Sequence, residues 1–68
     1  MKVKTTQALD MEVGQAYSIP TSAGPKEVYI TEDVTSYDSE YVEVFGRNMT
    51  DNNDFDQLVK WDTECEDC

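Results

Sequence analysis

The feature that most constrains this chain is an alternation of apolar and polar residues with a period of two, in short segments separated by turn-forming residues. The clearest segment is Lys26–Asp33, and Glu40–Phe45 repeats the pattern before Gly46 interrupts it. Such alternation is typical of strands that bury one face, and no segment shows sustained helical periodicity. The sequence therefore predicts an all-β, or mostly β, protein.

Two further segments of the N-terminal half follow the same pattern. Leu9–Val13 alternates up to a glycine, and Gln15–Ile19 resumes the alternation up to Pro20. Residues 1–6 suit a short strand or a loose arm. Because only a short polar stretch separates Lys26–Asp33 from Glu40–Phe45, these two segments are predicted to pair as an antiparallel hairpin.

The C-terminal third is less regular. Residues 51–54 are too polar to pack and are expected to form an exposed loop. The spacing of apolar residues in Phe55–Trp61 fits either a short helical turn near residues 54–59 followed by a strand, or an irregular strand. Residues 63–68 carry acids and two cysteines without apolar periodicity, and are expected to be a flexible, dispensable tail. The predicted domain is thus residues 1–62.

A chain of 68 residues has room for one hydrophobic core. Four to five short antiparallel strands are too few for a two-sheet sandwich, so they are expected to curl into a small barrel that limits exposed strand edges. Met11 and Met49 are expected to fill gaps in its core. The core is predicted to contain one face of the two clearest strands and the single tryptophan: Val28, Ile30, Val42, Val44 and Trp61.

The spacing of Leu9, Val13-Gly14-Gln15 and Tyr17, followed by a hairpin and a closing strand with a tryptophan, resembles SH3-like small β-barrels. The resemblance extends over most of the chain. It implies a fold and no particular function.

The charge of the chain restricts its partners. Fifteen acidic residues against five basic ones give a formal charge of −10. Direct binding to nucleic acid or to an anionic membrane would be opposed by repulsion, whereas basic partners are favoured. No apolar run is long enough for a membrane-spanning helix, and no signal peptide is recognisable, so we expect a cytoplasmic protein.

The residues needed for common chemistries are also missing. There is no histidine, the commonest general acid or base and the commonest metal ligand at neutral pH. Paired carboxylates would need a cleft to shift their pKa values, and so small a barrel has little wall to form one. We therefore expect no enzymatic activity and no cofactor.

Two segments have features of metal-binding motifs. A calcium loop of the EF-hand type starting at Asp51 would place Phe55, Asp56 and Asp62 where an oxygen ligand, a glycine and a glutamate are required, so no calcium site is expected. Cys65 and Cys68 have the spacing of half a zinc site. We interpret them as incidental exposed thiols, with a zinc ion bridging two chains as the alternative.

The acidic residues concentrate on and around the predicted hairpin, together with tyrosines. Acids two residues apart on a strand lie about 7 Å apart, which is similar to the spacing of successive phosphates along one strand of nucleic acid. A row of such acids could therefore mimic DNA. The alternative is that acidity only keeps a small domain soluble. The predicted partner-binding residues are Glu32, Asp33, Tyr37, Asp38, Glu40, Tyr41 and Glu43.

In composition, the chain resembles small phage-encoded acidic proteins that inhibit host enzymes, some of them as DNA mimics. That resemblance implies a viral protein acting in the host cytoplasm. The sequence thus favours an inhibitor or adaptor that docks on a basic surface of a larger, nucleic-acid-handling protein. The alternative function is a structural module that assembles into a homo-oligomer.

Overall fold

The computed structural model describes residues 4–67, which form seven strands and one turn of 3₁₀ helix. The strands are β1 (Thr5–Gln7), β2 (Ala16–Ile19), β3 (Lys26–Ile30), β4 (Thr35–Ser36), β5 (Tyr41–Asn48), β6 (Asp54–Lys60) and β7 (Glu64–Asp67). The 3₁₀ turn, η1, covers Ala8–Asp10 between β1 and β2.

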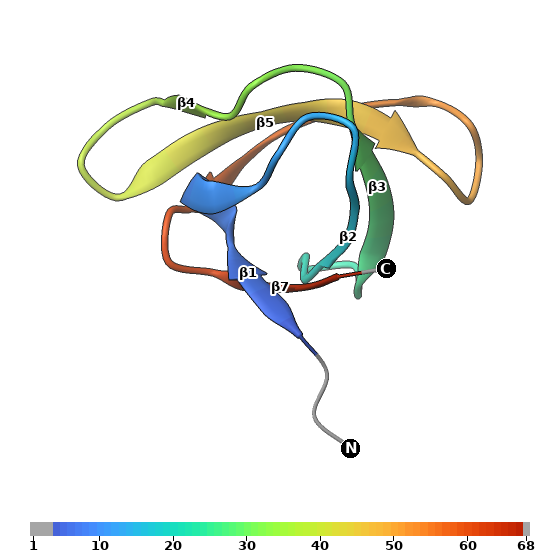
Figure 1. Ribbon diagram of the computed structural model, residues 1–68, viewed down its shortest axis with the longest axis horizontal. Helices are drawn as coiled ribbons and strands as arrows, with labels where there is room; N and C mark the ends of the chain where they lie inside the picture. The colour runs from blue at the N-terminus through green and yellow to red at the C-terminus, as the bar shows by residue number, and fades with distance from the viewer. Residues whose placement is uncertain (1–3, 68) are drawn as a thin grey trace.

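The strands form one antiparallel sheet that curls into a half-barrel (Figure 1). Its order is β1-β7-β2-β3-β5-β6, and the short β4 shares one edge of β5 with β3. The last strand, β7, lies between β1 and β2, so the two ends of the chain are joined in the sheet. The predicted all-β, barrel-like fold is confirmed, with more strands than expected because residues 35–36 and 64–67 also pair.

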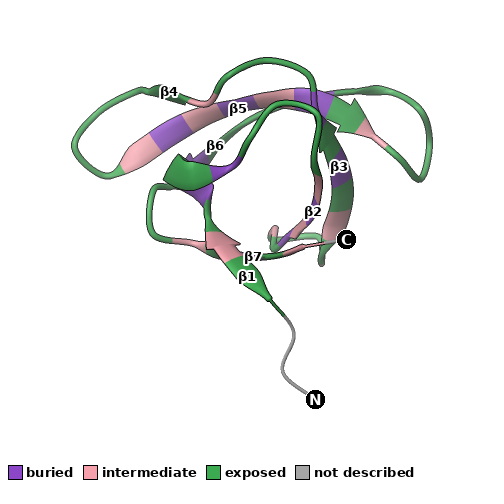
Figure 2. Cartoon of the chain, in the orientation of Figure 1, coloured by how far each residue is buried: buried purple, intermediate pink, exposed green. Residues whose placement is uncertain are grey.

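The core lies on the concave side of this sheet. Along β5 the residues alternate between buried and half-buried, as the period-two pattern predicted (Figure 2). Val28, Ile30, Val42 and Val44 are buried, which confirms four of the five predicted core residues. The remaining buried residues are Ala8, Met11, Tyr17, Ile19, Phe55, Val59 and Cys65.

Gly46 does not end its strand. β5 continues through it to Asn48, and β3 pairs with β5 over this extension, with Ile30 opposite Gly46. The predicted antiparallel pairing of the two segments therefore exists, but at the far end of β5. Glycine is required here because a Cβ would lie 2.8 Å from Val28 Cγ1 and would overlap the carbonyl oxygen of Tyr29.

The prediction that Trp61 closes the core is wrong. Its side chain is 41% exposed, because the residue follows β6 in the turn that leads to β7. Phe55 and Val59, on the inward face of β6, fill the core instead. Met49 is also exposed, since it lies in the β5–β6 turn, whereas Met11 is buried as expected.

The alternating segment Leu9–Val13 is not a strand. Its first residues form η1, and the backbone N–H of Leu9 donates to the carbonyl oxygen of Trp61 over 3.0 Å instead of to a neighbouring strand. Leu9 and Val13 are exposed, and only Met11 of the apolar set points into the core. Period-two alternation over so few residues does not distinguish a strand from an irregular connection.

The C-terminal third is more regular than expected. Residues 54–60 form strand β6 with no helical turn, which agrees with the strand alternative and not with the helical one. The expected flexible tail is also wrong: Glu64–Asp67 forms β7, and Cys65 is fully buried. Pairing with two neighbouring strands stabilises a segment whose own sequence lacks apolar periodicity. Cys68 lies outside the described residues.

We expect truncation after Thr63 to abolish the cooperative thermal unfolding transition. The deletion exposes one edge each of β1 and β2 and removes the buried Cys65 from the core. Circular dichroism during heating measures the effect. A control that lacks only Cys68 retains all of β7 and should melt like the full chain. A truncated protein with an unchanged transition would contradict the position of β7.

We expect Trp61→Ala to destabilise the protein by about 1–2 kcal/mol, less than Ile30→Ala, which should cost about 2–5 kcal/mol. Ile30 is fully buried, whereas much of the Trp61 ring already contacts solvent. Urea unfolding of the two variants provides the comparison. An equal or larger loss for Trp61→Ala would show that the ring belongs to the core.

Candidate functional site

The predicted partner-binding residues do not form one cluster, because they spread along the length of β5. Asp38 lies in the turn before this strand, and its Oδ1 accepts hydrogen bonds from the backbone N–H groups of Glu40 and Tyr41, both over 2.8 Å. These bonds fix the turn, a common role of aspartate. Tyr37 beside it is 64% exposed. This end of β5 therefore combines two exposed carboxylates with an exposed aromatic ring.

An apolar groove adjoins this turn. It has a volume of about 310 Å³ and is lined by Leu9, Ser36, Asp38, Ser39, Val42 and Trp61. The backbone holds Trp61 in place, since its N–H donates to the carbonyl oxygen of Glu40 over 3.0 Å and its carbonyl accepts from Leu9. We call this groove, with Tyr37 and Glu40 at its edge, the Trp61 groove. Leu9 and Trp61 were not predicted as surface residues, because large apolar side chains such as these are usually buried.

Glu32 lies near the other end of β5. It lines a hollow of about 290 Å³ together with Asp54 and Asp56, and the half-buried ring of Phe45 is part of its wall. Glu32 and Asp33 both lie in the connection between β3 and β4, and Asp33 is exposed as well. Asp54 and Asp56 were not predicted as site residues. The signal for them was their two-residue spacing, which puts both on the outward face of β6.

Tyr41 and Glu43 occupy the outward face of β5 between these two ends. Glu43 is opposite Thr35 on β4 and opposite Leu58 on β6. Tyr41 is half-buried and contributes to a groove with Leu58 and the Pro20–Ser22 turn. The predicted residues are thus divided among the Trp61 groove, the Glu32 hollow and the β5–β6 face.

The acidic surface is almost uncompensated. No charged residue within residues 4–67 is buried, and the one ion pair found there joins Lys4 Nζ to Asp67 Oδ2 over 3.8 Å. Cross-strand neighbours such as Arg47 and Asp54 do not approach to ion-pair distance. Most of the negative charge therefore remains available to a partner.

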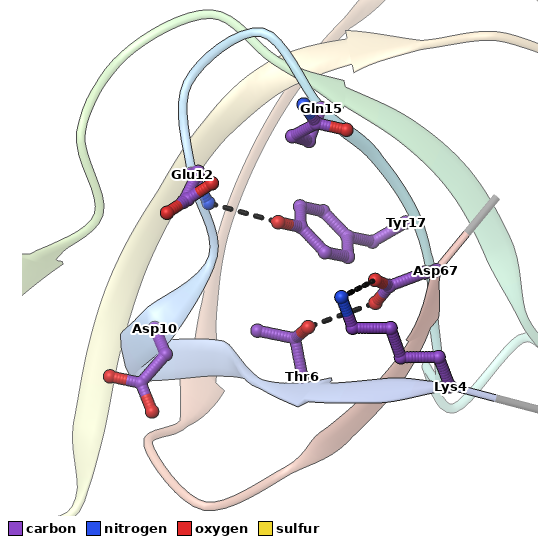
Figure 3. A pocket seen from close by; sticks show the side chains of 7 residues that line it. All are labelled: Lys4, Thr6, Asp10, Glu12, Gln15, Tyr17 and Asp67. Carbon is purple, nitrogen blue, oxygen red and sulfur yellow. Dashed lines mark hydrogen bonds and ion pairs between the residues drawn. The ribbon is translucent and has the colours of Figure 1, made fainter.

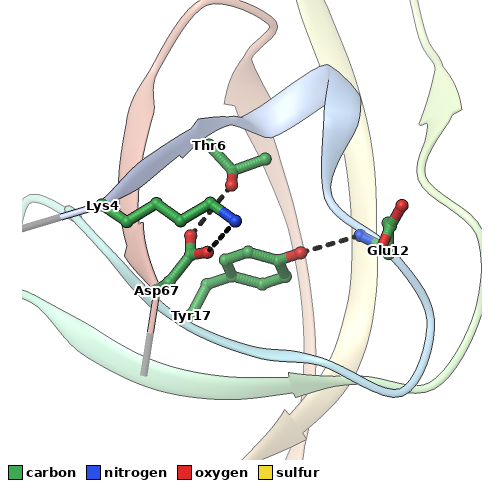
Figure 4. Close-up of polar contacts among 5 residues, drawn as sticks. All are labelled: Lys4, Thr6, Glu12, Tyr17 and Asp67. Atoms are coloured by element: carbon green, nitrogen blue, oxygen red, sulfur yellow. Dashed lines mark hydrogen bonds and ion pairs between the residues drawn. The ribbon is translucent and has the colours of Figure 1, made fainter.

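A polar cavity of about 290 Å³ lies at the end of the barrel where β1 meets β7 (Figure 3). Thr6 Oγ1 donates to Asp67 Oδ1 over 2.9 Å, on the same carboxylate that pairs with Lys4 (Figure 4). The hydroxyl of Tyr17 accepts a hydrogen bond from the backbone N–H of Glu12 over 3.1 Å. These bonds tie β1 to β7, and β2 to the loop before it, so Thr6, Tyr17 and Asp67 have structural roles in this cavity.

Asp51, in the turn after β5, also has a structural role. Its Oδ1 accepts a hydrogen bond from the N–H of Asn53 over 3.1 Å, and Asn52 has a positive φ of 62° in the same β5–β6 turn. Within residues 4–67 no group of three or more His, Cys, Asp or Glu side chains is arranged to hold a metal ion.

Cys65 is not an exposed thiol as expected. It is buried in the core, where burial and, second, the negative charge of Asp67 raise the pKa of its thiol from 9.0 to about 11. Its Sγ lies 3.7 Å from the carbonyl oxygen of Thr63. A buried thiol with a raised pKa is a poor nucleophile, so Cys65 behaves as a small apolar core residue.

The fold and these surfaces define a small acidic all-β module whose exposed aromatic and carboxylate groups border shallow grooves. Comparisons of the chain with protein-family models, with curated proteins and with solved structures find no match. The resemblance to SH3-like barrels and the resemblance to small acidic phage proteins are not tested by these comparisons, and both stay predictions. In the described part of the chain, no helix has the length and apolar character needed to cross a membrane.

The raised pKa of Cys65 predicts a loss of stability at alkaline pH. Below about pH 9 the thiol is protonated in both states, whereas between about pH 9 and 11 the unfolded chain loses this proton and the folded protein keeps it. The free energy of unfolding should therefore fall as the pH rises through this window. Urea unfolding of Cys68→Ser, with and without Cys65→Ala, isolates the effect. Equal pH slopes for the two proteins would contradict it.

Proposed function

We propose that this protein is a non-catalytic acidic module that docks on a basic surface of a larger, nucleic-acid-handling protein in the cytoplasm and inhibits or adapts it. The observation that carries the proposal is the uncompensated surface charge. Fifteen acids lie in the described chain, none is buried, and Asp67 alone makes an ion pair there. Such a field accelerates association with a positively charged partner.

The Trp61 groove supplies the short-range part of the interaction. Leu9 and Trp61 are about half exposed, and Asp38 and Glu40 border them. An apolar anchor surrounded by charged groups is the usual arrangement of a protein-binding surface, in which the buried aromatic residue determines how long the complex lasts. Electrostatics and the groove thus contribute to different steps of binding.

The spacing of the acids supports mimicry of a nucleic acid by this module. Asp54 and Asp56 are two residues apart on β6. The pair lies on one face of its strand at about 7 Å, close to the separation of successive phosphates along one strand of nucleic acid. A groove that binds such phosphates would meet carboxylates at a similar interval.

The proposal is tested with a charge variant and a matched control. Asp38→Asn, Glu40→Gln and Glu43→Gln together remove three charges near the Trp61 groove, and Asn at 38 keeps the oxygen that accepts the bonds fixing the turn. The control combines Glu27→Gln, Glu64→Gln and Glu66→Gln, an equal loss of charge on β3 and β7. The partner is recovered by pull-down with the unmodified protein, and its binding kinetics are then measured.

We expect a basic, nucleic-acid-binding partner. The charge variant should associate about tenfold more slowly, with a much smaller change for the control. Trp61→Ala should instead increase the dissociation rate by at least about tenfold. Raising the salt concentration should slow association of the unmodified protein. If both charge variants bind as the unmodified protein does, and it forms a homo-oligomer without a basic partner, the assembly function replaces the proposed one.

A further inference from the structure

We propose that the free edge of β6 binds an extended, partly basic segment of a partner protein as an added strand. This inference rests on the proposed function in one respect, the basic character of the partner. β6 pairs with β5 over all seven residues from Asp54 to Lys60, and within residues 4–67 no strand pairs with its other edge. β6 thus forms one end of the curled sheet (Figure 2).

Two hydrogen bonds show which backbone groups of β6 point to that edge. The N–H of Trp61 donates to the carbonyl oxygen of Glu40 over 3.0 Å, and the N–H of Asn48 donates to that of Asn53 over 2.7 Å. Both pairs continue the β5–β6 register. Hydrogen-bonded and non-hydrogen-bonded pairs alternate in an antiparallel ladder, so the odd-numbered residues of β6 bond to β5. The even-numbered residues point their N–H and C=O groups to the free edge.

Three consecutive even-numbered residues offer both groups: Asp54, Asp56 and Leu58. Within the described chain none of these groups has a backbone hydrogen-bond partner. Lys60 differs, because its carbonyl oxygen accepts from the N–H of Thr63 over 3.0 Å. The edge therefore matches the hydrogen-bonding needs of an extended segment, which is how sheet edges bind peptides in strand addition.

The C-terminal half of this edge opens into a groove. Its volume is about 490 Å³, and its walls are the turn at Pro20–Ser22 on one side and residues 57–60 of β6 on the other. Tyr41 and Leu58 contribute apolar surface, and Leu58 is 44% exposed. The groove offers space beside β6 and apolar contacts for side chains of an added strand.

Charge along the edge indicates the chemistry of its occupant. Asp54 and Asp56 lie on the N-terminal half of β6, whereas Leu58, Lys60 and Tyr41 line the groove at its C-terminal half. A complementary segment therefore carries lysine or arginine at one end and apolar residues at the other. A second copy of this chain is disfavoured, because it has a charge of −10 and would bring a second set of these edge aspartates against the first.

The test uses a synthetic peptide with alternating lysine and valine in one half and alternating threonine and valine in the other. Amide hydrogen exchange of the unmodified protein is followed by NMR at increasing peptide concentration. We expect exchange at Asp54, Asp56 and Leu58 to slow by about tenfold or more at saturation, and binding to weaken with salt. A glutamate-for-lysine peptide serves as the charge control and should not bind.

Peptides methylated on alternate backbone nitrogens test the added hydrogen bonds without changing the protein. One methylation pattern blocks the N–H groups that face β6 and should abolish binding, whereas the opposite pattern leaves them intact. Asp56→Pro removes one edge N–H of the protein, and Asp56→Asn keeps it. The proline variant should bind at least about tenfold more weakly than the asparagine variant.

Equal binding of both methylated peptides, or protection at residues outside β6, would overturn strand addition. Formation of a β6-to-β6 dimer by the free protein would also overturn it, in favour of a second copy as the occupant. None of these three results predicts how the charge variants at the Trp61 groove bind the recovered partner, so failure here is distinguishable from failure of the proposed function.

Discussion

The rest of the structure depends on the insertion of β7 between β1 and β2. This pairing joins residues from the two ends of the chain, with Thr6 opposite Cys65 and Tyr17 opposite Asp67. It buries Cys65 and places a carboxylate where Thr6 and Lys4 bind it. A chain of this size buries a limited core. Because β7 covers one edge of β1 and one edge of β2, it contributes more to the stability of the fold than its four residues suggest. Trp61 lies in the turn that leads into β7, where its ring is 41% exposed.

The high negative charge fits this architecture because every acid stays at the surface. Strands that bury one face leave the alternate positions to solvent, and these positions hold carboxylates on β6 and β7. Self-repulsion among so many like charges destabilises a compact state, so a surface with a single ion pair in the described chain is costly. That cost is consistent with a charge retained for a partner. Two places on this surface offer more than solvated charge: the edge of β6, with its unpaired backbone groups, and the apolar Trp61 groove.

Much of the fold could be predicted from local pattern. The alternation in residues 26–30 and 41–45 predicted two strands and four buried residues correctly, although the two strands pair through residues 46–48 of β5. The same reasoning failed where pairing partners are distant. Nothing in Glu64–Asp67 indicates a strand, since its neighbours β1 and β2 supply the hydrogen bonds. For the candidate site, the exposure of Tyr37 was anticipated, whereas the roles of Leu9, Trp61 and Asp56 depend on neighbours far along the chain.

The sequence by itself determined the class of the fold, the charge of the surface and the identity of five of the eleven buried apolar residues, because alternation and composition act residue by residue. Tertiary structure decided the strand order, the burial of Cys65 and the exposure of Trp61. It also decided that β5 continues through Gly46 and leaves β6 with an open edge. The physical reason is that edges and cavities are properties of contacts between segments, and the free energy of such contacts overrides the weak preference of any short segment alone.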